Sequence, residues 1–227
     1  EDLLCDESRS VRFETELWFR SSAIERNQRA EHITKLIQQM DGRVVSQAIL
    51  EGISYHAILG EMPASSVQAI IENPEIELTL CDSVMFFRPI GQMTIGTIPS
   101  KEETDVFVDV DTSMPSGEAV IALLDGMPLA NHSLLKNRLH IDDPDNFEAD
   151  YAATERVHGT SMASLIIHGD LSIQSSPLNR PVYVRPIMKP IPWNTQPRPE
   201  LMPGDCLVVD LIHRAVKRSV SYTHLRA

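Results

Sequence analysis

Apolar and polar residues alternate over residues 12–20, which predicts a half-buried strand. Its apolar side consists of Phe13, Thr15, Leu17 and Phe19. Ser22 and Glu25 then form a capping-box pattern. Apolar residues follow at helical spacing until Gly42, which predicts a helix that ends there.

The next part of the chain predicts a hairpin, a second helix and a last strand. Strands are expected over residues 44–50 and 53–59, joined in a hairpin at Glu51-Gly52. Pro63 begins a short helix that ends at Asn73-Pro74. The alternation of Ile76, Leu78 and Leu80 predicts a strand that reaches Phe86 or Phe87. The resulting order is βαββαβ, the split-βαβ arrangement of ferredoxin-like domains.

The second half of the chain opens with a strand that is apolar on both sides. Residues 119–124, Ala-Val-Ile-Ala-Leu-Leu, are typical of a buried parallel strand. Asp125 follows directly, at the end of the strand where open α/β sheets place functional groups. A plain turn aspartate is the alternative interpretation of Asp125.

A second candidate residue, His158, begins a run of small and apolar residues that extends to residue 167. This run predicts a helix that is apolar on every side and therefore lies in the middle of a core. A carboxylate beside His158 would fix its tautomer and leave the other ring nitrogen free to accept a proton. A purely structural histidine is the alternative.

Composition and charge exclude some classes of protein and divide the chain. The 227 residues carry a net charge of −12 and are 42% hydrophobic, which favours a folded protein and argues against a nucleic-acid partner. No apolar run approaches the roughly 20 residues that span a membrane. We expect a poorly ordered segment over 1–10, the ferredoxin-like unit over 11–89, a linker over 90–117 and a parallel-sheet α/β unit over 118–219.

Three other features suggest weaker expectations. Cys5, Cys81 and Cys206 are few and far apart, which favours a reducing, cytoplasmic compartment and packed rather than reactive thiols at Cys81 and Cys206. Trp193 lies in a proline-rich stretch, where it could line a cleft or anchor a surface loop. An acidic loop lacks the spacing of an EF-hand, so we expect it to be solvated rather than to bind a metal. Its members are Asp142, Asp143, Asp145, Asn146, Glu148 and Asp150.

Two segments resemble motifs of one enzyme family. Residues 125–135, which start with Asp125-Gly126, are similar to the aspartate box of the subtilisin-like serine peptidases, with His132 and Leu135 in the following turn. His158-Gly159-Thr160 resembles the histidine box of the same family. Residues 180–188 and 210–218 resemble the strand and helix that follow it, and the βαββαβ unit is similar to the family's prodomain. The resemblance covers residues 12–219.

The resemblance implies a serine endopeptidase with an Asp-His-Ser triad that needs no metal or organic cofactor. It implies that Asp125 orients His158, with Gly126, Gly159 and Thr160 in support, and that the substrate is a peptide or protein. The nucleophilic Ser and the oxyanion Asn of the family come later in the chain. We therefore expect residues 1–227 to be an inactive N-terminal fragment with a non-native tail over 220–227.

The motifs also depart from the family's usual pattern. The family's Asp-Ser/Thr-Gly turn is Asp125-Gly126-Met127 here, so the hydroxyl beside the aspartate is missing. The histidine box has the sequence His158-Gly-Thr-Ser-Met-Ala-Ser164. Both are similar to a divergent bacterial intracellular branch that is sometimes encoded beside an AAA-type ATPase, which makes such an ATPase a candidate partner.

Ser161 is an alternative nucleophile, because residues 159–163 also match the family's Gly-Thr-Ser-Met-Ala serine box. A nucleophile elbow needs an apolar strand directly before it, whereas residues 152–157 contain Thr, Glu and Arg. Leu165 also stands where the serine box normally has Pro. The spacing from Asp125 favours the histidine box.

Two alternatives to an enzyme stay open. The missing hydroxyl beside Asp125 would suit a non-catalytic protein of the same fold that binds a peptide or protein. A ferredoxin-like sensor joined to an unrelated Rossmann-type domain is weaker, because no Gly-x-Gly-x-x-Gly follows the strand at 119–124.

Overall fold

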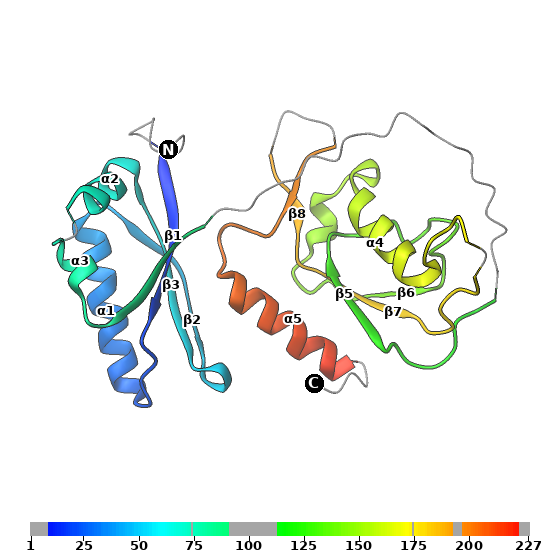
Figure 1. Ribbon diagram of the computed structural model, residues 1–227, viewed down its shortest axis with the longest axis horizontal. Coiled ribbons are helices and arrows are strands. Elements are labelled where there is room, and N and C mark those ends of the chain that lie inside the picture. Colours follow the sequence, from blue (N-terminus) through cyan, green and yellow to red (C-terminus); the bar gives the residue numbers. More distant parts are fainter. Residues whose placement is uncertain (1–8, 74, 91–112, 174, 193–196, 223–227) are drawn as a thin grey trace. The chain divides into compact units, whose positions relative to one another are not determined.

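The computed structural model describes residues 9–73, 75–90, 113–173, 175–192 and 197–222, and it contains two compact units (Figure 1). The first unit comprises residues 1–91 and 204–211, and the second comprises residues 92–203 and 212–227. Most of the expected linker at 90–117 and of the N-terminal segment at 1–10 lies outside the described residues.

The first unit is a four-stranded antiparallel sheet with helices, in the predicted βαββαβ order (Figure 1). The order of strands across the sheet is β2-β3-β1-β4. Ser22 caps the first helix by accepting a hydrogen bond from the Glu25 amide at 3.4 Å. The elements are β1 (Ser10–Leu17), α1 (Ala23–Gln39), β2 (Arg43–Leu50), β3 (Tyr55–Pro63), α2 (Ala64–Glu72), α3 (Glu77–Leu80) and β4 (Val84–Pro89).

The predicted hairpin forms, since β2 pairs antiparallel with β3, but two local details of this unit differ from the prediction. The expected hairpin turn is a short 3₁₀ helix, Glu51–Ile53, followed by Ser54 in the left-handed conformation, so β3 begins only at Tyr55. The expected strand from Ile76 is the helix α3, because the amides of Thr79 and Leu80 both donate to the Ile76 carbonyl. Apolar residues two apart fit either a strand or one short helical turn with a buried Leu78.

The expectation that β1 is only half-buried is also wrong. Phe13 and Leu17 pack in the core formed with α1, but Glu14 on the opposite face is only 5% exposed. Its carboxylate accepts hydrogen bonds from the Tyr55 hydroxyl at 3.0 Å and from Arg88 at 2.9 Å. This face carries a second apolar cluster, which consists of Ala48, Tyr55, Ala57, Leu59 and Leu207.

The second unit contains a three-stranded parallel sheet, as the apolar strand at 119–124 predicts. Its order is β5-β7-β6, and both neighbouring pairs run parallel. A short antiparallel pair, β8 with β9, lies beyond β7 in the chain. The elements are β5 (Ile121–Asp125), β6 (Leu139–Ile141), η2 (Phe147–Asp150), η3 (Ala153–Glu155), α4 (Val157–His168), β7 (Val182–Pro186), β8 (Lys189–Pro190), β9 (Glu200–Leu201) and most of α5 (Val208–Tyr222), whose residues 208–211 group with the first unit.

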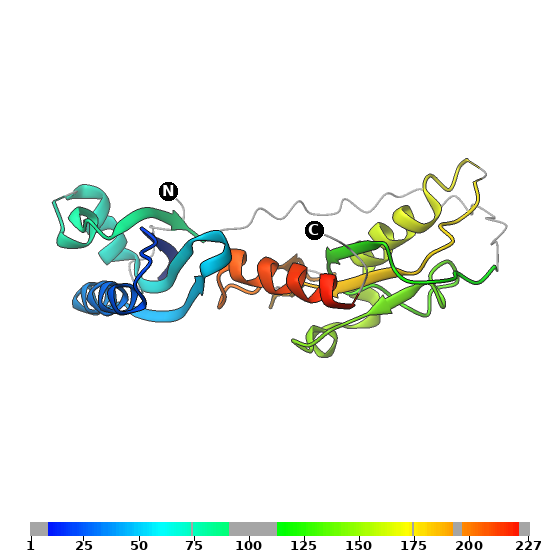
Figure 2. The same cartoon turned by 90° about the horizontal axis from the view of Figure 1, so that it is seen from below.

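Helix α4 begins where the sequence predicts but is not surrounded by a core within the described residues. Ala163 and Ile167 are buried against the sheet, which Figure 2 shows along one side of α4, and Gly159 is buried against the loop after β5. Val157 and Leu165 on the outer side are 50% and 56% exposed. Within the described residues the sheet covers one face of α4, so the prediction that α4 is buried on every side is wrong.

The helix predicted at 210–218 is confirmed and is longer than expected. Helix α5 continues through Tyr222, so the first three residues of the expected non-native tail at 220–227 belong to this helix. Within the second unit, Ala215 and Ser219 are buried one turn apart. Residues 223–227 lie outside the described part.

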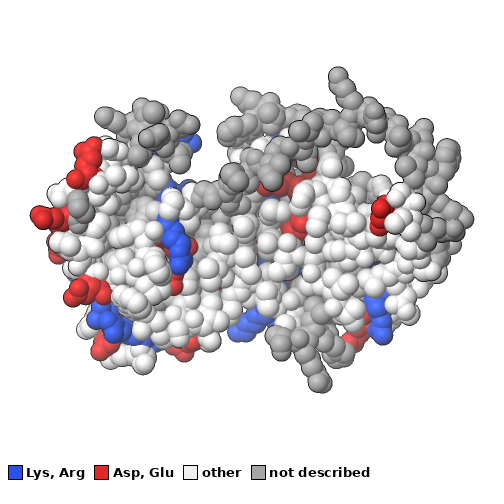
Figure 3. All heavy atoms as spheres, in the orientation of Figure 1, with Lys and Arg blue, Asp and Glu red and all other residues white. Residues whose placement is uncertain are grey.

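The described surface mixes both signs of charge. On the face drawn in Figure 3, Lys and Arg side chains are interspersed with Asp and Glu side chains. Within the described residues, no helix is both long and apolar enough to cross a bilayer.

Candidate functional site

Asp125 and His158 are far apart in the sequence and lie in direct contact in the second unit. Asp125 is the last residue of β5, and His158 is the second residue of α4. The Nδ1 atom of His158 lies 2.7 Å from the Oδ1 atom of Asp125. The aspartate side chain is only 9% exposed, whereas the histidine side chain is 49% exposed. A buried carboxylate at a rigid strand end therefore holds a solvent-accessible imidazole.

The contacts of Asp125 determine which ring nitrogen of His158 is available. The Gly126 amide donates to Asp125 Oδ1 at 2.6 Å, so this oxygen is fixed from the backbone as well as by the ring. An ionised carboxylate only accepts hydrogen bonds, so Nδ1 of His158 carries the proton in the contact. The neutral ring then has a bare Nε2, which can accept a proton from a group at the surface.

Gly159 and Thr160 bring the start of α4 against the loop that follows β5. A Cβ atom on Gly159 would lie 2.4 Å from the Gly126 carbonyl oxygen, a distance that side chains do not adopt. The Thr160 hydroxyl accepts a hydrogen bond from the Leu129 amide at 2.8 Å and donates to the Arg156 carbonyl. Because Gly159 has no side chain and Thr160 joins the two segments, His158 can reach Asp125.

The turn after Asp125 contains the two other residues of the aspartate-box resemblance. The amides of Leu135 and Lys136 both donate to the His132 carbonyl at 2.9 Å. Leu135 is fully buried in the cluster beneath α4. His132 and Leu135 therefore stabilise the turn. Among the described hydrogen bonds, none joins either residue to the His158 ring.

Glu200 and Tyr151 belong to the same site, although no sequence pattern predicts either of them. The Tyr151 hydroxyl donates to Glu200 Oε1 at 2.6 Å. A Cβ atom on Gly126 would lie 2.1 Å from that same oxygen, so the Glu200 carboxylate fills the space beside Asp125 that a side chain at position 126 would need. No local motif marks Glu200, since its position depends on the pairing of β8 with β9.

Burial is the main influence on the ionisation of this second carboxyl group. It raises the pKa of Glu200, and the negative charges of Asp125 and Glu155 act in the same direction. The hydrogen bond from Tyr151 and the charge of His158 oppose this change and lower the pKa of Glu200. Burial and the contact with Glu200 also raise the pKa of Tyr151, so its hydroxyl keeps its proton and acts as a donor.

Ser161 is exposed on α4, three residues after His158. Among the described hydrogen bonds, none joins the Ser161 hydroxyl to the His158 ring. The structure thus brings Asp125 and His158 together without including Ser161 in that pair.

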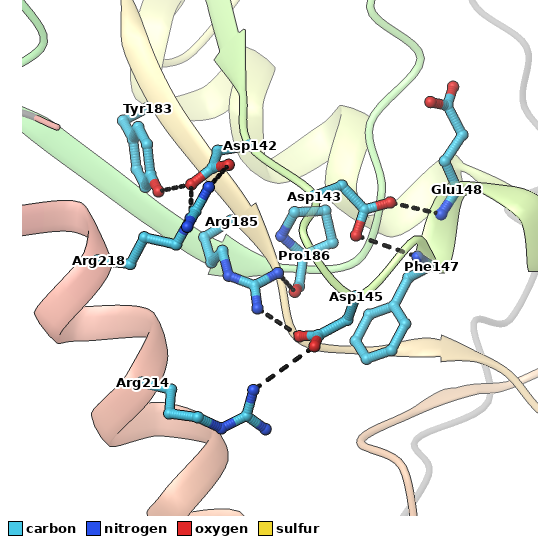
Figure 4. A network of polar contacts seen from close by, with 10 residues as sticks. All are labelled: Asp142, Asp143, Asp145, Phe147, Glu148, Tyr183, Arg185, Pro186, Arg214 and Arg218. Atoms are coloured by element: carbon cyan, nitrogen blue, oxygen red, sulfur yellow. Dashed lines mark hydrogen bonds and ion pairs between the residues drawn. The ribbon is translucent and has the colours of Figure 1, made fainter.

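The acidic loop is largely exposed, as expected, but several of its carboxylates are also held by ion pairs and hydrogen bonds that the sequence does not predict (Figure 4). Arg218 of α5 contacts both Asp142 oxygens at 2.5 and 2.9 Å, and these hydrogen bonds lower the pKa of Asp142. Asp145 pairs with Arg185 and lies 3.5 Å from Arg214. Asp143 accepts hydrogen bonds from the amides of Phe147 and Glu148. The described part of the chain contains no cluster of His, Cys, Asp and Glu suited to a metal.

The two cysteines within the described residues belong to the first unit, whereas Asp125 and His158 belong to the second. Neither Cys81 nor Cys206 forms a disulfide within the described residues, both are partly exposed, and Cys81 packs against the core of the first unit. Cys5 and Trp193 lie outside the described residues.

Comparison with protein-family models, with curated proteins and with solved structures gives no match to this chain. The geometry of Asp125 and His158 is therefore the main support for any functional proposal.

Proposed function

We propose that the chain is part of a serine endopeptidase of the subtilisin type, in which Asp125 and His158 are two members of an Asp-His-Ser triad. The observation that carries this proposal is the 2.7 Å contact between a buried carboxylate and the Nδ1 atom of an exposed imidazole. Its place at the carboxyl end of a parallel strand is also typical of catalytic groups in α/β proteins. The βαββαβ order of the first unit suits the role of a prodomain.

In this proposal, Asp125 keeps the Nδ1 proton in place and His158 acts as the base through Nε2. His158 accepts the proton of a serine hydroxyl while the serine oxygen attacks a peptide carbonyl. The imidazolium then gives that proton to the leaving amine, and water regenerates the serine in a second, equivalent round. We place the serine and the oxyanion donor outside residues 1–227. The substrate would be a peptide or protein in the cytoplasm, with an AAA-type ATPase as a candidate partner.

Labelling by a fluorophosphonate probe tests this proposal in the protein encoded by the complete reading frame. The wild-type protein should be labelled on one serine, and His158→Ala or Asp125→Asn should slow labelling by at least about 10²-fold. His32→Ala is the matched control, because His32 is an exposed histidine of α1. Wild-type protein that takes no label, or labelling that does not depend on His158, would reject the proposal.

One observation favours the non-catalytic alternative. Gly126 replaces the residue that carries a hydroxyl in the resembled family, and Glu200 occupies its space. A wild-type protein that binds peptides but takes no label would support this binding function. Mass spectrometry of the labelled peptide also tests Ser161, because a label at Ser161 would make it the nucleophile.

A further inference from the structure

The Glu200 carboxylate lies against the turn that joins Asp125 to the start of α4. Its Oε1 atom is 2.1 Å from the position that a Cβ atom on Gly126 would take. The Gly126 amide donates to Asp125 at 2.6 Å. The Gly126 carbonyl oxygen is 2.4 Å from the position of a Cβ atom on Gly159, the residue after His158. Gly126 therefore contacts Glu200 and also both segments that supply the Asp125–His158 pair.

One oxygen of the Glu200 carboxylate is held by the protein, and the other has no described hydrogen-bond partner. The Tyr151 hydroxyl donates to Oε1 at 2.6 Å and also lies 3.0 Å from the Met188 carbonyl. Tyr151 is only 8% exposed, so it holds the carboxylate from the inside of the unit. Glu200 itself is partly exposed, and no hydrogen bond within the described residues involves its Oε2 atom. Oε2 can therefore accept a hydrogen bond from a molecule in solution.

The cationic side chains on the segments beside Glu200 are paired with other carboxylates. The Arg198 guanidinium contacts both oxygens of Glu155 at 2.6 and 2.7 Å. Lys189 of β8, the strand paired with β9, lies 3.2 Å from Asp150. Within the described residues, no Lys or Arg side chain forms an ion pair with Glu200. Burial raises the pKa of this unpaired carboxyl group, and a cation from outside the chain would stabilise its ionised form.

We propose that Glu200 is a specificity residue: its carboxylate binds a cationic nitrogen of the peptide substrate, either a Lys or Arg side chain or a free N-terminal amine, beside Asp125 and His158. This inference rests on the proposed peptidase function. A carbonyl that reacts beside His158 brings the neighbouring residues of the peptide close to the Gly126 turn. A cation there forms a charge-assisted hydrogen bond with Oε2, whereas a neutral side chain leaves the carboxylate unpaired.

Paired peptide substrates test this inference in the protein encoded by the complete reading frame. The two peptides of a pair have acetylated N-termini and differ only in Arg against citrulline at one position, and the pairs move this position along the peptide. At one position, the wild-type kcat/KM should be at least about 10-fold higher for the Arg peptide, and Glu200→Gln should remove this preference. Peptides without Lys or Arg, compared with free and with acetylated N-termini, decide whether the preferred cation is the N-terminal amine.

Two further variants sharpen the comparison. Glu148→Gln, which changes a largely exposed carboxylate of the same unit, should leave the preference unchanged. Glu200→Lys should reverse it in favour of Glu at the same position of the peptide. Each preference is a ratio of two substrates for one variant, so it does not depend on the fraction of that variant that is folded. A wild type that does not prefer cationic peptides, or a preference that survives Glu200→Gln, would overturn the inference.

A binding measurement on residues 1–227 separates this inference from the peptidase proposal. The ¹⁵N-amide NMR signal of Gly126 is followed during titration with two cations, N-acetyl-arginine amide and glycinamide, and with neutral N-acetyl-citrulline amide. At least one cation should shift this signal saturably in the wild type and in Glu148→Gln but not in Glu200→Gln. No response to either cation, or an equal response to the citrulline compound, would overturn the inference. If the wild-type complete protein takes no fluorophosphonate label, the peptidase proposal fails, while this titration still decides whether Glu200 binds a cation.

Discussion

At the scale of single residues, the site depends on two glycines as much as on its charged groups. Gly159 lets α4 approach the loop after β5, and Gly126 leaves the space that Glu200 fills. The sequence predicts Asp125, His158 and these glycines, because each belongs to a continuous segment with a recognisable pattern. It does not predict Glu200, because no spacing rule links a proline-rich stretch to the end of β5.

A Gly126→Ala substitution tests the space beside Asp125. The new methyl group would lie 2.1 Å from Glu200 Oε1 and 2.9 Å from the Tyr151 hydroxyl, so the free energy of unfolding should fall by about 1–3 kcal/mol. In a protein that already carries Glu200→Ala, Gly126→Ala should lower the free energy of unfolding by less. Urea denaturation of the wild type, the two single variants and the double variant measures this difference.

The matched control for this cycle is Gly52→Ala, since a Cβ atom at position 52 meets nothing within 4 Å. If Gly126→Ala lowers the free energy of unfolding equally with Glu200 and with Ala at position 200, Glu200 does not occupy the space beside Gly126.

Glu155 gives a pH dependence of stability with a defined sign. Its hydrogen bonds with Arg198 lower the pKa of Glu155 from 4.5 to about 2 in the folded protein. Because the pKa of Glu155 is lower in the folded protein than in the unfolded chain, the ionised carboxylate stabilises the fold at pH values above 4.5. This stabilisation disappears as the pH falls from 4.5 towards 2. The stability difference between the wild type and Glu155→Gln should therefore shrink over this window.

Urea denaturation at a series of pH values measures this difference. Glu148→Gln, which changes a largely exposed carboxylate of the same unit, serves as the control. A Glu155→Gln difference that stays constant between pH 4.5 and 2 would contradict the assigned ion pair.

At the scale of elements, the sequence predicts the type and order of most helices and strands but not how completely each is buried. Alternation over Ile76–Leu80 fits a strand, yet hydrogen bonds to the Ile76 carbonyl make it the helix α3. The acidic loop gives no indication of its partners, because Arg214 and Arg218 lie about seventy residues further along the chain. Such long-range pairing is set by packing and has no local pattern.

The contact of α5 with the acidic loop depends on Arg218 more than on Arg214. Arg218 binds both oxygens of Asp142, whereas Arg214 lies 3.5 Å from an oxygen of Asp145 (Figure 4). A lysine at position 218 cannot form the bidentate hydrogen bonds with Asp142, so Arg218→Lys should lower the free energy of unfolding by about 1–2 kcal/mol.

Arg214→Lys, one turn earlier on the same helix, should cost less than 1 kcal/mol in the same measurement, as roughly expected for an exposed pair. If the two substitutions have equal effects, the Asp142 pair does not anchor α5.

At the scale of the whole molecule, composition predicts a folded chain, and the structure divides it into two units. The sequence predicts that all of residues 118–219 belong to the second unit, whereas residues 204–211 group with the first. This grouping follows from tertiary contacts such as those of Leu207, which lies in the cluster with Tyr55 and Leu59. A single apolar residue gives no indication of which core it joins.

If the first unit is a prodomain, the complete protein should cleave itself between Pro89 and Gly117. Most of this segment lies outside the described residues. Mass spectrometry of the purified protein should find the cut in the wild type and in His32→Ala but not in His158→Ala. An intact chain in a preparation that takes the fluorophosphonate label would contradict the prodomain role.

The tautomer of His158 tests the central claim most directly, because it can be measured by ¹⁵N NMR on residues 1–227 alone. In its neutral form, the ring should carry its proton on Nδ1, bonded to Asp125, with Nε2 bare and able to accept a proton. Asp125→Asn should reduce this preference. A proton on Nε2 of the neutral wild-type ring, or a tautomer that does not respond to Asp125→Asn, would contradict the account.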